Sequence, residues 1–188
     1  MTETAKSISV SCANGVVYVR VAGPGTFQNG PPLRRFALEM INCGQQQFII
    51  DLAQCQGMDS TFLGVLAGIG LRLHHDDRDG KVRVIEVNAR NMESLQTLGL
   101  DRLFDVIAVG IYRPDRSPPA DTEFRGLPDA DIAKLCTRLN KNDAADLMLE
   151  AHGNLIQTDQ RNAEKFVELT RCLRDRVEKR TTAEKKQP

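Results

Sequence analysis

The sequence has no excess of charge of either sign, and this balance limits the function classes open to it. Its 25 Lys and Arg residues are matched by 25 Asp and Glu residues, which gives a formal net charge of zero over 188 residues. A dedicated nucleic-acid-binding protein normally carries a basic excess on one face. We therefore expect no nucleic-acid partner.

Long hydrophobic runs are also missing. No stretch approaches the ~20 apolar residues that a membrane-spanning helix needs. The first residues, Met1 to Lys6, lack the apolar segment of a secretory signal peptide. Hydrophobic residues still make up 41% of the chain, which is enough for a packed core. These features predict a cytoplasmic protein without membrane association.

Cysteine is scarce and unpatterned. The five cysteines, at positions 12, 43, 55, 136 and 172, are odd in number, and no two stand at the short spacing of metal ligands. This predicts neither a disulfide framework nor a metal site, and favours free thiols in a reducing compartment. A Gly-rich phosphate-binding loop is absent as well, because Gly23-Pro24-Gly25 lacks the following Lys. We expect no cofactor.

Up to about residue 114, strand-like and helix-like patterns alternate. The chain opens with a predicted hairpin, in which Asn14-Gly15 joins two apolar strands, because both residues tolerate positive φ. The alternation predicts an α/β fold with a mixed β-sheet and helices packed on one face. The elements expected after the hairpin are helix 31–43, strand 47–52, helix 60–73, strand 81–87, helix 92–98, a helical turn at 101–104 and strand 106–111.

Beyond this block the pattern becomes helical only. Residues 115–128 contain Ser117-Pro118-Pro119-Ala120 and are predicted to be a linker, because proline interrupts strands and helices. A C-terminal all-helical extension is expected over 129–188, with helices at 129–139, 143–156 and 162–177. Three short helices bury little surface alone. We therefore expect them to pack against the domain formed by residues 1–114, or to form an interface with another chain such as a homodimer.

An Asp-Ser-Thr cluster, residues 59–61, stands where the strand at 47–52 passes into the helix that follows. The first turn of a helix has free N–H groups and a partial positive charge. A serine at this place either caps the helix or carries a phosphate that the helix end stabilises. The residues alone leave both interpretations open.

The chain resembles the STAS domain of bacterial anti-sigma factor antagonists over about residues 6–113. The resemblance rests on the order of the elements, on Asp51-Leu52 at the end of the third strand, and on two segments. These are residues 58–64, Met-Asp-Ser-Thr-Phe-Leu-Gly, and residues 98–104, Leu-Gly-Leu-Asp-Arg-Leu-Phe.

The resemblance implies a non-enzymatic regulator of transcription that acts by partner switching. Its implied phosphoacceptor is Ser60, and its partner-binding residues are Asp59, Ser60, Thr61 and Phe62. The implied partners are an anti-sigma factor serine kinase, which brings the ATP, and a cognate phosphatase. One position departs from the family, which usually has Gly where Phe62 stands. A bulky aromatic there is expected to cover or reshape the surface around Ser60.

Two other functions stay open. One is a STAS scaffold or sensor subunit of a larger regulatory or transport complex that is never phosphorylated. The other is a hydrolase that uses Ser60, although G-x-S-x-G is not met and His74 and His75 lie roughly 20 Å along the same helix. His152 is expected to be solvated or to cap a helix. Exposure of the Ser60 hydroxyl separates the phosphorylated switch from the scaffold.

Overall fold

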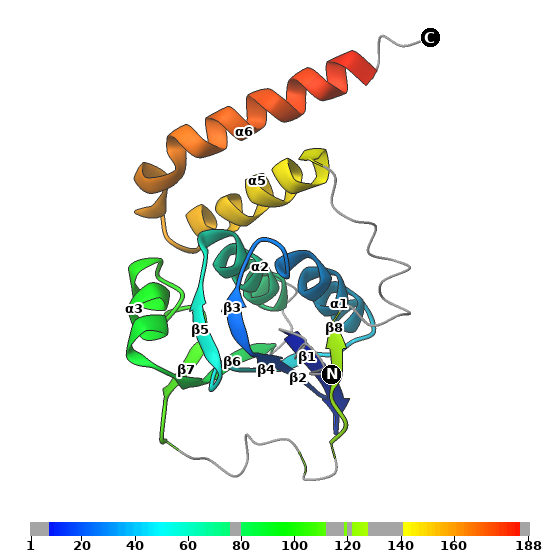
Figure 1. Ribbon diagram of the computed structural model, residues 1–188, viewed down its shortest axis with the longest axis vertical. Helices are drawn as coiled ribbons and strands as arrows, with labels where there is room; N and C mark the ends of the chain where they lie inside the picture. Colours follow the sequence, from blue (N-terminus) through cyan, green and yellow to red (C-terminus); the bar gives the residue numbers. More distant parts are fainter. Residues whose placement is uncertain (1–7, 76–79, 112–118, 120–121, 128–140, 185–188) are drawn as a thin grey trace, which may run out of the picture.

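The computed structural model describes residues 8–75, 80–111, 119, 122–127 and 141–184, which form stacked layers (Figure 1). A six-stranded sheet is the base, and helices α1 (Gly30–Asn42) and α2 (Ser60–His75) cover one of its faces. Helices α5 (Lys141–Thr158) and α6 (Asn162–Glu184) form the next layers beyond α2. The predicted mixed sheet with helices on one face and a helical extension is confirmed.

The sheet mixes parallel and antiparallel pairs. Strands β1 (Ile8–Ala13) and β2 (Val16–Val21) form the antiparallel hairpin, with Asn14 and Gly15 at φ 52° and 75° as predicted. Strands β2, β4 (Gln47–Asp51), β6 (Lys81–Val87) and β7 (Asp105–Ala108) then run parallel to one another. Parallel strands need crossover helices, which α1, α2 and α3 (Ala89–Thr97) supply.

The core lies between this sheet and its helices. The central strand β4 buries Phe48, Ile49 and Ile50, as expected for a strand covered on both sides. From α1, Leu33, Ala37 and Ile41 face this core at four-residue spacing. Helix α3 is capped by Asn88, whose side chain accepts from the Asn91 amide.

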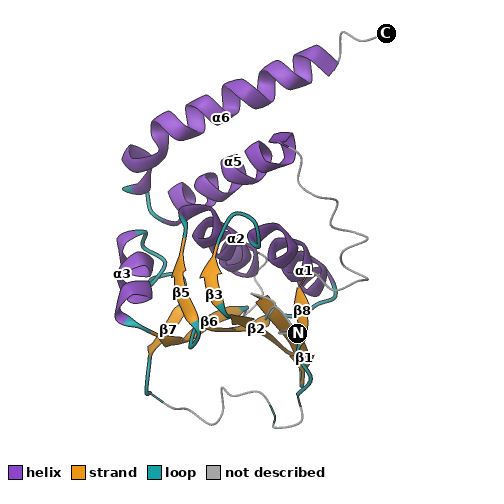
Figure 2. Ribbon diagram, viewed as in Figure 1, coloured by secondary structure: helices purple, strands orange, loops and turns teal. Residues whose placement is uncertain are grey.

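Three short strands were not predicted. Strands β3 (Gly23–Gly25) and β5 (Cys55–Met58) pair in parallel as a second small sheet (Figure 2). Strand β8 (Arg125–Leu127), inside the predicted linker, pairs with β1 at the sheet edge. These segments are too short and glycine-rich to show an alternating pattern, so only their distant partners define them as strands.

The C-terminal helices fold back on the first domain. Helix α5 packs on α2, and α6 packs on α5 (Figure 1). The helix predicted at 129–139 lies outside the described residues. Of the two predicted arrangements, the chain therefore shows packing against its own first domain, while a homodimer stays a prediction.

Glycines allow α2 and α5 to approach closely. A Cβ atom at Gly64 would lie 2.3 Å from the Ala151 carbonyl oxygen, and one at Gly68 would lie 2.5 Å from Nδ2 of Asn154. Asn154 uses that nitrogen to donate to the Gly64 carbonyl over 3.1 Å. Any larger residue at Gly64 would push the two helices apart, so this glycine is needed for the packing rather than for a turn.

The turn between α5 and α6 is tied to the segment after α3. Asp159 forms ion pairs with Arg161 and with Arg102, and Asn162 donates to the Leu98 carbonyl over 2.9 Å. Lys165 reaches the Thr97 carbonyl at 2.6 Å. Residues 97–102 therefore hold the extension in place.

Asp159 makes this anchor dependent on pH. Hydrogen bonds from Arg161, with the charge of Arg102 adding to them, hold the pKa of Asp159 far below its usual range. A depressed carboxyl pKa stabilises the fold above the unfolded pKa of about 4, and this contribution is lost as the pH falls toward the folded value. We expect Asp159→Asn to lower the thermal midpoint at pH 7, and the gap to wild type to shrink between about pH 4 and pH 2.

Asp175→Asn, on an exposed position of α6, is the matched control and should leave the midpoint unchanged at every pH. Thermal unfolding followed by circular dichroism measures all three proteins. A gap that stays constant down to pH 2 would show that the Asp159 carboxylate charge does not hold the turn.

Candidate functional site

Asp59 fixes the start of α2. Its Oδ1 accepts from the Phe62 amide and its Oδ2 from the Phe27 amide, both at 2.8 Å, and its own amide donates to the Gly25 carbonyl over 2.9 Å. A carboxylate that accepts from the third residue of a helix is an N-cap. Asp59, and not Ser60, therefore caps α2, and the Ser60 hydroxyl has no capping role.

The loop beside Asp59 is held by its own hydrogen bonds. Asn29 accepts from the Thr26 amide at 2.7 Å and donates to the Pro24 carbonyl over 2.9 Å. Strand β3, which leads into this loop, pairs with β5, which leads into Asp59. The start of α2 at Ser60 therefore lies beside a loop whose conformation is held by hydrogen bonds.

The β5 strand is fixed from the other side by α3. Asn88 and Asn91 both donate to the Cys55 carbonyl, over 3.2 and 3.1 Å. Burial raises the pKa of the Cys55 thiol, which keeps it protonated and supports a packing role. Nothing in this arrangement makes Cys55 a nucleophile.

Thr61 and Phe62 lie in the interior, with exposed fractions of 4% and 0%. The Phe62 ring fills the space beside Gly25, where a Cβ atom would come within 2.6 Å of the ring. Of the two expected effects of Phe62, covering the surface around Ser60 is wrong, because Gly25 makes room for the ring inside the core; reshaping of that surface stays a prediction. Of the four predicted partner-binding residues, only Asp59 and Ser60 are partly exposed.

His152 of α5 contacts Ser60. Its Nε2 lies 3.1 Å from the Ser60 Oγ, and its Nδ1 lies 2.6 Å from the Met148 carbonyl oxygen. A carbonyl can only accept, so Nδ1 carries the proton, and in the neutral ring Nε2 is then the acceptor. With the His152 ring neutral, Ser60 donates its hydroxyl proton to Nε2.

The surroundings of His152 differ from the sequence expectation. The residue is 2% exposed and its ring stands 4.7 Å from that of Phe166 in α6, so the expectation of a solvated or capping residue is wrong. The sequence held one signal for this position, since residue 152 falls on the apolar stripe of its helix, one turn after Met148. The partner serine, 92 residues away, could not be found from that stripe.

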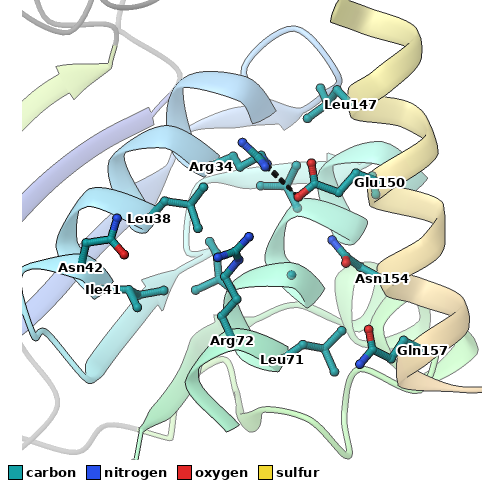
Figure 3. Close-up of a pocket in the computed structure, with 14 residues that line it drawn as sticks. Arg34, Leu38, Ile41, Asn42, Leu71, Arg72, Leu147, Glu150, Asn154 and Gln157 are labelled. Atoms are coloured by element: carbon teal, nitrogen blue, oxygen red, sulfur yellow. Dashed lines mark hydrogen bonds and ion pairs between the residues drawn. The ribbon is translucent and has the colours of Figure 1, made fainter. Parts of the chain in front are cut away.

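A cavity of 380 Å³ opens farther along α2, between α1, α2 and α5 (Figure 3). Among its lining residues, Arg34 of α1 pairs with Glu150 of α5 over 2.8 Å, and Arg72 of α2 lies close by (Figure 3). Ser60 is not one of its lining residues. The cavity is thus separate from the Ser60–His152 contact, although α5 contributes to both.

Two kinds of site are missing from the part of the chain that the structure describes. It holds no group of three or more His, Cys, Asp or Glu side chains able to ligate a metal ion. Within the same residues, no helix combines the length and apolarity needed to cross a membrane.

The cap predicts a stability effect at Asp59. Removal of an N-cap side chain costs about 1 kcal/mol, within a range of roughly 0.5–2. We expect Asp59→Ala to lower the free energy of unfolding by about this amount, and Asp59→Asn, which keeps an accepting oxygen, to lose less. Urea denaturation measures both, and equal losses in the two variants would show that the oxygen does not cap α2.

Comparison with known proteins places the fold in a family. The model of the STAS domain matches residues 7–112. No curated protein sequence matches the chain at a significant level.

Solved structures resemble the chain only distantly. An anti-sigma factor antagonist from Mycobacterium paratuberculosis is 22% identical, with 56% of this chain and 90% of that chain covered and a TM-score of 0.48. The unphosphorylated anti-sigma factor antagonist SpoIIAA is 16% identical, with coverages of 47% and 81% and a TM-score of 0.44. These similarities are too low to transfer a function. The family match, however, spans more than half of the 188 residues, and the chain therefore belongs to the STAS domain family.

Proposed function

We propose that this protein is an anti-sigma factor antagonist-like regulator that acts by partner switching, with Ser60 as its phosphoacceptor. The observation that carries the proposal is the position of Ser60 in a STAS domain. It is the first residue of α2, it is partly exposed, and Asp59 leaves its hydroxyl free of capping. A hydroxyl at a helix N-terminus is well placed to carry a phosphate, and here its hydrogen bond to His152 would be given up for the phosphate.

Phosphorylation would strongly change the charge at the start of α2. A phosphate adds about −1.5 to −2 charges at neutral pH. The Asp59 carboxylate next to it accepts from the amides of Phe62 and Phe27, so a phosphate on Ser60 would add to a negative charge already present at this end of α2. A partner matched to the neutral hydroxyl would then face an anionic surface and be released.

The partner enzymes, a kinase and a phosphatase, would carry out the chemistry of the switch. An anti-sigma factor serine kinase brings ATP, the Ser60 Oγ bonds to the γ-phosphorus as the bond to ADP breaks, and the hydroxyl proton passes to a base. A cognate phosphatase reverses the step with water. The protein itself needs no cofactor, and we place it in the bacterial cytoplasm, where it regulates transcription.

We also propose that the Ser60–His152 pair is not a hydrolase. A serine nucleophile needs a base that is oriented by a third group and that opens onto a substrate site. Here the third group is the Met148 carbonyl, and the His152 ring is packed between α2 and Phe166. The pair has the geometry of a structural contact.

A second function is favoured by the same contact. The Ser60 hydroxyl is already bonded to a buried side chain of the same molecule. A STAS scaffold or sensor subunit of a larger complex, never phosphorylated, would have no need to break this bond. The two functions differ in whether Ser60 is modified in the cell.

Mass analysis of Ser60 in protein isolated from its own host is the first test of the switch. The second is partner capture by wild type, Ser60→Ala and Ser60→Glu. We expect phosphate on Ser60 under some growth condition, and Ser60→Glu to lose a partner that wild type holds. Loss of one or two well-packed contacts costs about 2–4 kcal/mol, or roughly 30- to 1000-fold in affinity.

Ser94→Glu is the matched control, because it adds the same charge on α3, where Ser94 only donates to the Arg90 carbonyl. It should capture the same partners as wild type. Absence of phosphate under every growth condition, together with identical partners for all four proteins, would reject the switch and leave the scaffold.

A further inference from the structure

The 380 Å³ cavity between α1, α2 and α5 lies where the STAS domain meets the helical extension (Figure 3). Helices α1 and α2 belong to the domain and α5 to the extension, so neither part of the chain forms the cavity alone. Its volume is within the range of roughly 300–1000 Å³ that is usual for small-molecule sites, which also prefer the boundaries between parts of a protein. Neither Ser60 nor His152 lines it.

The most deeply buried large side chains of the cavity are aliphatic. They come from all three helices and belong to the core of the molecule: Ile41, Val65, Ile69 and Leu147. Among the described residues that line the cavity, none is aromatic. Such walls favour a hydrocarbon chain, which leaves water at a gain in free energy, over a planar ring that needs an aromatic partner for stacking.

The charges that line the cavity do not balance. Arg34 donates from Nε and Nη2 to Oε1 of Glu150, over 3.0 and 2.8 Å, so these two charges match each other. Arg72 of α2 forms no hydrogen bond or ion pair with any residue that the structure describes. Within the described lining these three residues carry all the charge. One positive charge is therefore left over, and it favours a ligand with one negative charge.

Neutral amide groups complete the lining. Asn42 comes from α1, and Asn154 and Gln157 come from α5. Asn154 donates from Nδ2 to the Gly64 carbonyl over 3.1 Å, and its Oδ1 has no partner among the described residues. Side-chain amides both donate and accept, so they add polarity to the cavity without changing its charge.

We propose that this cavity binds a small aliphatic monocarboxylate. The carboxylate pairs with Arg72, because a planar guanidinium matches a carboxylate with two parallel hydrogen bonds. The hydrocarbon chain lies against the aliphatic side chains of the three helices. Since the ligand contacts α5 as well as α1 and α2, it stabilises the packing of the extension on the domain. The site is independent of the function proposed for Ser60.

Isothermal titration calorimetry of the full chain with hexanoate tests the site. Hexanamide has the same shape without the charge, and hexylammonium reverses the charge. We expect one hexanoate per chain with a Kd of about 1 mM or below, and at least about tenfold weaker binding of the other two compounds. The thermal midpoint should rise with hexanoate concentration, as it does for any ligand that binds only the folded chain.

Three variants locate the carboxylate. Arg72→Met keeps a long unbranched side chain without the charge, and should bind hexanoate at least about tenfold more weakly. Arg90→Met removes an exposed arginine of α3 outside the cavity, and should bind as wild type does. Glu150→Gln leaves Arg34 unmatched, which raises the positive charge of the lining, and should bind hexanoate about threefold more tightly or better.

Absence of saturable hexanoate binding up to about 20 mM would overturn the proposal. Equal affinities for hexanoate and hexanamide would overturn it too, as would weaker binding in Glu150→Gln, because the charge of the lining would then not select the ligand. Equal losses in Arg72→Met and Arg90→Met would place the carboxylate outside the cavity. Ser60→Glu should bind hexanoate as wild type does, so the cavity and the switch are tested separately.

Discussion

The carboxylate of Asp59 is the contact on which the rest of the site depends. Its two oxygens accept from the first turn of α2 and from the loop after β3, at 2.8 Å each. These two hydrogen bonds fix where α2 begins and in which direction its first residues point. Thr61 and Phe62 then face the interior, while Ser60 is partly exposed and contacts His152. The Ser60 hydroxyl is not needed as a cap because its neighbour satisfies the helix end.

Helix α2 is packed on two sides for different reasons. Toward the sheet it presents Leu63 and Leu66, which belong to the apolar core. Toward α5 it presents Gly64 and Gly68, which bring in backbone and polar contacts instead of large apolar side chains. The first side holds the STAS fold together. The second is a close contact between helix backbones, with the 380 Å³ cavity beside it.

The helical extension thus adds contacts at Ser60, the residue that we propose as phosphoacceptor. In this chain the Ser60 hydroxyl forms a hydrogen bond with His152 of α5. The extension is anchored at a distance from Ser60, through Asp159 and Asn162 on the segment after α3.

The sequence by itself determined the alternating sheet and helices, the hairpin at Asn14-Gly15 and the place of Ser60 at a helix start, because periodicity and turn chemistry are local. Tertiary structure alone decided the β3–β5 pairing, the inward direction of Phe62 and the contact of Ser60 with His152. Each of these joins residues distant in the chain. Whether a serine or a neighbouring aspartate caps a helix likewise depends on side-chain geometry. The spacing of residues in the sequence does not predict that geometry.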